Sequence, residues 1–167
     1  SPPQIRVQML RLHSPDEAFR AIALLMAADK GYAGIPLAIA PRLWTAVCQR
    51  RYWLLVADSE PVGCVLWGEI STATLVQSLR QRREPLGTDL QERGDALMAL
   101  GLLAKTPALV TALWRHFIRA NAQRPVLAVR HFGRHAHDPR FLLYLNGRAC
   151  TDAQVRHWLG QQAGAPD

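Results

Sequence analysis

Short apolar runs along the chain predict the strands of a sheet. Six runs carry this pattern, at residues 5–12, 52–57, 62–67, 95–104, 126–132 and 140–145. The first run alternates apolar and polar positions, as a half-buried strand does, whereas the second is continuously apolar. The segment Asp58-Ser59-Glu60-Pro61 between the second and third runs is rich in turn-forming residues. Because a tight turn joins antiparallel neighbours, these two strands are predicted to pair antiparallel.

Apolar residues spaced three and four apart predict the helices. The predicted helices lie at residues 15–30, 41–50, 72–79 and 107–121, with a last one from Thr151 that buries Val155, Trp158 and Leu159. Ser14 can cap the first helix, Pro15 fits its first position, and Glu17 can bond back to the cap. The polar, arginine-rich stretch from Arg80 to Gly94 predicts an exposed loop.

The predicted element order is β-α-α-β-β-α-β-α-β-β-α. Strands that alternate with helices late in the chain favour parallel neighbours, so the sheet is predicted to be mixed. We therefore expect an α/β (α+β) fold, with a mixed, mostly antiparallel sheet flanked by helices. With 167 residues, of which 49% are hydrophobic, the chain is predicted to form a single domain over residues 1–167. This element order is the one found in GNAT-type N-acyltransferases.

Composition narrows the cellular setting. No run of 18 apolar residues exists, which argues against a membrane span, and Ser1-Pro2-Pro3 does not resemble a secretory leader, so we expect a soluble, cytoplasmic protein. Cys48, Cys64 and Cys150 are odd in number and lack a CxxC spacing. Their odd number and the absence of this spacing argue against both a disulfide framework and a zinc site, so the cysteines are predicted to be buried, reduced thiols.

Positive charge is concentrated toward the C-terminal part of the chain. The formal net charge is +7, of which residues 106–167 contribute +5 from eight basic and three acidic residues. An acidic partner is therefore predicted to bind this part. Nucleic acid is the less favoured partner, because no predicted helix carries a dense arginine stripe and aromatic residues are not interleaved with the basic ones.

A family resemblance rests on the two strands that carry Trp53 and Trp67. The matching residues are Tyr52-Trp53-Leu54-Leu55, Pro61-Val62-Gly63-Cys64-Val65-Leu66-Trp67 and Ile70-Ser71. In this order they resemble the Q-Y-x-L-L … P-V-A-Y-C-S-W-A-x-L-S stretch of the RTX toxin-activating lysine acyltransferases. Further collinear matches are Pro36-Leu37-Ala38-Ile39, Gly94-Asp95, Ala128-Val129-Arg130 and Gly147-Arg148. The resemblance covers roughly residues 24–149.

The resemblance implies a GNAT-like fold and an activity that places a fatty acyl group on lysines of a protoxin in the cytoplasm. The acyl donor is then acyl carrier protein, and no further cofactor is implied. A lysine nucleophile needs a positioned base, and the family assigns this role to a histidine and an aspartate. Here the segment from Ala28 to Ala33 has no histidine, and Gly101 occupies the aspartate position. The chain is therefore predicted to be a catalytically degenerate relative.

Three residues are candidates for a relocated catalytic group: Asp29, Tyr32 and Asp95. Lone carboxylates at the ends of elements are also ordinary capping or surface groups. Cys64 is predicted to be a structural thiol, because a nucleophilic thiol needs a base and an accessible thiolate. The segment Lys105-Thr106-Pro107-Ala108 occupies the place of the GNAT pyrophosphate loop, but it has no glycine and Pro107 lacks an amide hydrogen. Coenzyme A binding is therefore not predicted.

The connection after residue 130 is rich in arginine and histidine. Its predicted partner-binding residues are Arg130, Arg134, His135 and Arg140, which suit an acidic carrier-protein helix or a phosphate. A solvated basic loop is the alternative. His131, His135, His137 and Asp138 resemble a metal cluster, but no cysteine or glutamate completes a familiar spacing, so no metal is predicted.

Two hypotheses of function follow. The first is a protein acyltransferase that modifies a secreted toxin or adhesin. The second is a non-enzymatic, GNAT-like protein-binding module that serves as a scaffold in a secretion or assembly system. The loss of both catalytic positions favours the second, and the sequence leaves open whether the protein is a homodimer.

Overall fold

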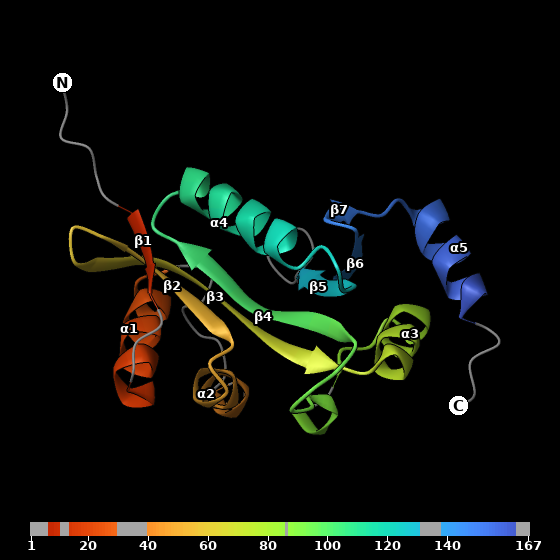
Figure 1. Cartoon of the computed structure of the whole chain (residues 1–167), viewed down its shortest axis with the longest axis horizontal. Helices are drawn as coiled ribbons and strands as arrows, with labels where there is room; N and C mark the ends of the chain where they lie inside the picture. Colours follow the sequence, from red (N-terminus) through yellow and green to blue (C-terminus); the bar gives the residue numbers. More distant parts are fainter. Residues whose placement is uncertain (1–6, 11–13, 30–39, 86, 131–137, 163–167) are drawn as a thin grey trace. The chain divides into compact units, whose positions relative to one another are not determined.

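The computed structural model describes residues 7–10, 14–29, 40–85, 87–130 and 138–162. The strands are β1 (Val7–Leu10), β2 (Tyr52–Ala57), β3 (Glu60–Ile70), β4 (Ala96–Ala104), β5 (Val126–Arg130), β6 (Arg140–Leu145) and β7 (Arg148–Ala149). The helices are α1 (Pro15–Ala28), α2 (Ala40–Cys48), α3 (Thr72–Gln81), α4 (Pro107–Ala120) and α5 (Asp152–Gln161), with a 3-10 turn, η2 (Gly87–Asp89). Figure 1 shows these elements with their labels.

The strands are hydrogen-bonded neighbours in their sequence order, from β1 to β7. The pairs β1–β2, β2–β3, β5–β6 and β6–β7 are antiparallel, whereas β4 pairs with β5 in parallel through Leu97↔Val126 and Met98↔Leu127. The connection between β4 and β5 contains α4, as a parallel crossover requires. The predicted fold, a mixed and mostly antiparallel sheet with flanking helices, is confirmed.

Helix starts follow the capping residues of the sequence. The Ser14 hydroxyl accepts a hydrogen bond from the Glu17 N–H at the start of α1, as predicted. The Ser71 hydroxyl does the same for Thr74 N–H at 3.0 Å, which supports the predicted helix after residue 71. Thr151 and Gln154 form a full capping box at the start of α5.

Two hairpin turns each contain a pair of residues with positive φ. Asp58 and Ser59 have φ of 51° and 66°, which suits a two-residue turn between paired strands. Asn146 and Gly147 have φ of 52° and 76° and connect β6 to β7. The sequence analysis missed β7, although Asn-Gly is a strong hairpin signal.

Backbone contacts divide the chain into two compact units. Unit 1 comprises Ser1–Trp67 with Leu100–Phe117, and unit 2 comprises Gly68–Ala99 with Ile118–Asp167. Strands β3 and β4 and helix α4 each contribute residues to both units. The single domain expected from length and composition stays a prediction.

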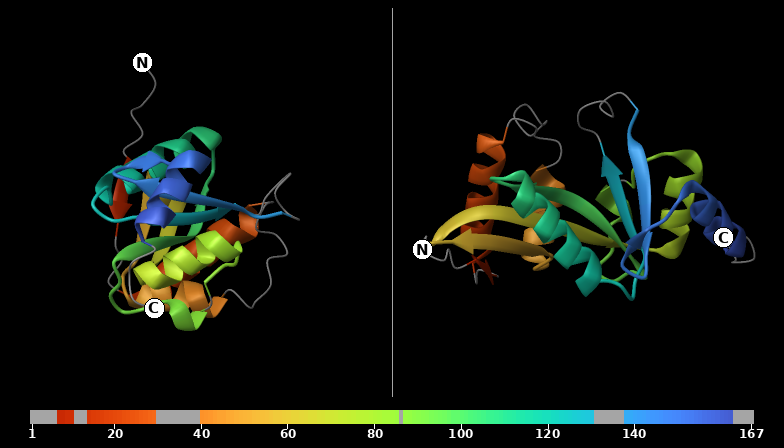
Figure 2. Two further views of the ribbon diagram at one scale, coloured as in Figure 1. Left: turned by 90° about the vertical axis from the view of Figure 1, so that its right-hand side faces the viewer. Right: turned by 90° about the horizontal axis from the view of Figure 1, so that it is seen from above.

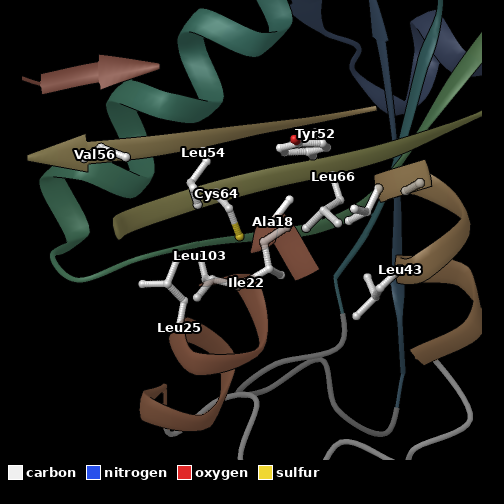
Figure 3. Close-up of a cluster of buried hydrophobic side chains, with 12 residues drawn as sticks. Ala18, Ile22, Leu25, Leu43, Tyr52, Leu54, Val56, Cys64, Leu66 and Leu103 are labelled. Carbon is white, nitrogen blue, oxygen red and sulfur yellow. The ribbon is translucent and has the colours of Figure 1, made fainter. Parts of the chain in front are cut away.

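In unit 1, α1 and α2 cover one face of β2 and β3 (Figure 1). Figure 3 shows the buried cluster that joins these elements. Its members are Ala18, Ile22, Leu25, Leu43, Ala46, Val47, Tyr52, Leu54, Val56, Cys64, Leu66 and Leu103. Residues two apart on β2 and β3 point to the same side, so one face of each strand supplies this core.

Aromatic side chains fill the opposite face of unit 1, beneath α4. The Phe117 ring is fully buried, and its centroid lies 5.6 Å from that of Trp53, 5.3 Å from Trp67 and 5.5 Å from Trp114. The exposed His116 ring lies 5.3 Å from Trp53. Tilted, edge-on and stacked ring contacts at these separations stabilise the fold beyond the apolar area they bury. Trp67 is buried, Trp53 and Trp114 are partly buried, and Trp44 is 40% exposed.

Unit 2 has its own core and an internal ion pair. The core is made by Ile70, Leu75, Ala96, Leu97, Met98, Ile118, Val126, Leu127, Ala128, Leu143 and Tyr144. Arg124 forms a salt bridge with Glu69, whose side chain is only 12% exposed, and also donates to the Gly94 carbonyl at 3.4 Å. In α5, Val155, Trp158 and Leu159 are half-buried, although the sequence predicted them to be buried. The stretch from Arg80 to Gly94 is not a simple loop, since it contains the end of α3 and η2.

Replacement of Phe117 tests the aromatic face. Phe117→Ala leaves a cavity among three tryptophans, so the free energy of unfolding should fall by about 3–5 kcal/mol. Phe117→Leu, which keeps most of the volume, should lose less than about 1.5 kcal/mol. Urea unfolding followed by circular dichroism measures both. A loss below about 1 kcal/mol for Phe117→Ala would show that this cluster adds little to stability.

Candidate functional site

The two candidate catalytic residues that the structure describes belong to different units. Asp29 ends α1 in unit 1, where its N–H donates to the Met26 carbonyl at 3.2 Å. Asp95 is exposed and immediately precedes β4 in unit 2. Tyr32 lies outside the described residues. The role of these three residues in catalysis stays a prediction.

The family position for an aspartate is occupied by a residue without an acid group. Gly101 lies within β4 and is buried. A glycine offers no side chain that could take a proton from a lysine. The acid–base chemistry of the toxin-activating acyltransferases, which the sequence resembles, therefore has no acidic side chain at this position.

The start of α4 offers little to a pyrophosphate. The Thr106 hydroxyl accepts from the Leu109 N–H at 3.2 Å, and Pro107 has no N–H to donate. In this first turn, the Ala108 N–H takes no part in the Thr106 cap. Phosphate sites at helix starts rely on several free amides, so this helix start is poorly suited to cradling coenzyme A.

The three cysteines differ in environment, which corrects the expectation that all are buried. Cys64 on β3 is fully buried, and burial raises the pKa of its thiol to about 12. Cys48 at the end of α2 is exposed, and Cys150 is partly exposed. Burial raises the pKa of Cys150, although a hydrogen bond from the backbone of Leu145 acts in the opposite direction. Cys64 is thus a structural thiol, as predicted.

Two of the four predicted partner-binding residues form an arginine pair. Arg130 at the end of β5 and Arg140 at the start of β6 are directly opposite each other in the antiparallel register. Figure 2 shows these two strands side by side (right-hand view). Both side chains are exposed, and neither forms a hydrogen bond or ion pair with a described residue. The other two residues, Arg134 and His135, lie outside the described part.

No described residue forms an ion pair with either member of the arginine pair. Like charges directly opposite on a strand pair destabilise it. Asp138 is the nearest described acidic residue in sequence, and it makes no ion pair within the described part of the chain. Two guanidinium groups on adjacent strands can each hold a carboxylate or phosphate with paired hydrogen bonds. The arrangement is suited to an acidic surface.

Metal-ligand residues do not gather in the described part of the chain. Within it, no group of three His, Cys, Asp or Glu side chains could hold a metal ion. The histidine cluster considered from the sequence, His131, His135 and His137, lies outside the described residues. Among the described residues, no helix has the length and apolar character needed to cross a membrane.

A cavity beside α5 was not anticipated from the sequence. Arg148, Cys150, His157 and Trp158 are among its lining residues. The signal that could have indicated it is the Asn-Gly turn, which brings the residues after β6 back toward that strand.

Comparisons with known proteins agree with the fold. No protein-family model and no curated protein matches the chain. Among solved structures, it is similar to the loading GNATL domain of CurA from Lyngbya majuscula, with a TM-score of 0.54 and 15% sequence identity, covering 76% of this chain and 67% of that one. The GphF GNAT-like decarboxylase in complex with isobutyryl-CoA gives a TM-score of 0.49 and 19% identity, covering 78% and 68%.

The likeness to the CurA domain shows that this chain has a GNAT-like fold. Membership of the toxin-activating acyltransferase family stays a prediction.

Alkylation tests the three thiol environments. With iodoacetamide at pH 8, Cys48 should react fastest, Cys150 more slowly and Cys64 not measurably, as followed by peptide mass spectrometry. Because the pKa of Cys64 is raised from 9.0 to about 12, its thiolate stays scarce as the pH rises from 8 to 10. In urea, all three should react alike. Labelling of native Cys64 at the rate of Cys48 would contradict the buried environment.

Proposed function

We propose that this chain is an acyltransferase-related, GNAT-like binding module that docks an acidic carrier protein at the arginine pair. The single observation that carries the proposal is the juxtaposition of Arg130 and Arg140, both exposed and without a described partner. The resemblance noted in the sequence supports the choice of partner, because that family takes its acyl group from acyl carrier protein.

Electrostatics support an acidic protein partner. Residues 106–167 carry eight basic and three acidic residues, and the arginine pair belongs to this part. Such a surface speeds encounter with an acidic partner and fixes its orientation. Binding of carboxylates would also relieve the repulsion between the two facing guanidinium groups.

The absence of a base at the family position supports binding without acyl transfer. Gly101 carries no ionisable group, and α4 begins with a proline and a capped amide. Toxin activation by lysine acylation is therefore the less supported form of the proposal. Retention of a GNAT-like scaffold for its surface accounts for both the fold and the missing groups.

Charge reversal at the arginine pair tests docking. Titration calorimetry with a purified carrier protein bearing a hexadecanoyl group should give a Kd at least about tenfold higher for Arg130→Glu/Arg140→Glu than for the unaltered chain. The matched control is Arg115→Glu/Arg119→Glu, which makes the same charge change at two exposed positions of α4. This control should bind nearly as well as the unaltered chain. Equal weakening of both variants, or no binding at all, would refute docking at the pair.

Acyl transfer is tested in a separate reaction. The chain is incubated with the charged carrier protein and a lysine-rich protoxin, and intact-mass spectrometry follows the protoxin. We expect no acyl adduct, because no base stands at the family position. A lysine adduct would instead establish an acyltransferase, and Asp29→Ala, Tyr32→Phe and Asp95→Ala would then identify its catalytic group.

A further inference from the structure

An open cavity of about 700 Å³ lies beside α5 and the β6–β7 hairpin, entirely within unit 2, and most of its lining residues are exposed. It is lined by Leu145, Asn146, Arg148, Ala149, Cys150, Ala153, Gln154, His157, Trp158 and Gln161. Its volume falls in the range of roughly 300–1,000 Å³ that is usual for small-molecule sites. Nothing in the proposed docking function uses these residues.

Local interactions hold the walls of this cavity in place. The Asn146-Gly147 turn pairs Leu145 with Arg148, and the Cys150 N–H donates to the Leu143 carbonyl at 2.9 Å. The capping box of Thr151 and Gln154 then starts α5 directly after the hairpin. At the far end of the helix, the Arg80 guanidinium donates to the Leu159 carbonyl at 3.3 Å.

The α5 wall is one stripe of the helix. Ala153, His157 and Gln161 are four residues apart, and Gln154 and Trp158 form the adjoining row. The Trp158 indole, with the side chains of Leu145, Ala149 and Ala153, supplies an apolar surface. Gln161 Nε2 lies 3.3 Å from His157 Nε2, so these two side chains already contact each other.

The charge of the lining is positive. Arg148 is exposed and forms no hydrogen bond or ion pair with a described residue. Among the described residues that line the cavity, none is acidic. A single guanidinium group matches the charge and planar shape of one carboxylate. The lining is thus suited to a carboxylate attached to an apolar body.

Cys150 lines this cavity, and its thiol is not expected to react with a ligand. Burial raises the pKa of its thiol, so the protonated form prevails near neutral pH and nucleophilic attack is disfavoured. The residue is nevertheless partly exposed and lines the cavity, so an occupied cavity would shield its thiol from a reagent in solution.

We propose that this cavity binds a small carboxylic acid with an apolar tail, its carboxylate on the Arg148 guanidinium and its tail against Trp158. This would be a second site, separate from the arginine pair, and it does not depend on the docking function. Octanoate is the probe that matches the single charge and the apolar wall.

Protection of Cys150 from iodoacetamide tests the proposal. Saturating octanoate should slow alkylation of Cys150 at least about fivefold, while exposed Cys48 keeps its rate and serves as the internal reference. Octanamide, which has the same tail without the charge, should protect far less, because it cannot pair with the guanidinium. Peptide mass spectrometry follows both cysteines in one sample.

A pair of variants assigns the carboxylate contact. Arg148→Ala should raise the Kd for octanoate, measured by calorimetry, about tenfold or more, which is the scale of a charge-assisted hydrogen bond. Arg156→Ala makes the same charge change at an exposed α5 residue outside the lining, so its Kd should be unchanged. Equal circular dichroism and melting temperature of the two variants would show that both are folded.

Several results would overturn the proposal. If octanoate gives neither binding heat nor protection of Cys150, the cavity is a water-filled gap between hairpin and helix. If octanamide protects as well as octanoate, or if Arg148→Ala binds octanoate as tightly as the unaltered chain, the carboxylate contact is wrong. Loss of binding in Arg148→Ala but not in Arg156→Ala supports it.

Discussion

Strand β3 is apolar on both faces, and the architecture of unit 1 depends on keeping both faces from water. Cys64 and Leu66 belong to the core beneath α1 and α2, whereas Trp67 packs against Phe117 of α4 on the other side. The strand also lies close to β4: a Cβ on Gly63 would lie 2.9 Å from the Ala104 Cβ, which leaves no room for a larger residue. A strand with one face in water would alternate polar and apolar residues, and this one does not. Because both faces of β3 are apolar, helices cover the strand on both sides.

Arginine has two different roles in unit 2, and the difference lies in the partner. Arg124 is bonded to a largely buried glutamate and a backbone carbonyl, so its charge is used inside the unit. Arg130 and Arg140 face each other at the end of a strand pair without a described acidic neighbour. Facing like charges are unfavourable in the isolated chain and become favourable when an anionic surface binds them. Arg148 is similar to this pair, because none of the described residues that line its cavity is acidic.

The candidate site could be predicted only in part. Arg130 and Arg140 were identified from composition, but their direct opposition depends on the register of β5 and β6. The catalytic candidates Asp29 and Asp95 were chosen by their place in the chain, and that place does not say what surrounds them. Cys48 was expected to be buried, yet it is exposed at the end of a short helix. Residue type alone does not reveal such surroundings, because burial is set by segments distant in the sequence.

The sequence by itself determined the fold class and most of the elements, although it did not give β7 or η2. Capping residues at Ser14, Ser71 and Thr151, and the continuous apolar strands, act through neighbours within a few residues, so a local pattern is enough to predict them. Only the tertiary structure decided which side chains meet: the tryptophans around Phe117, the opposed arginines and the walls beside α5. Those contacts join residues far apart in the chain. They result from strand register and from the packing of helices on the sheet, and a local pattern does not contain that information.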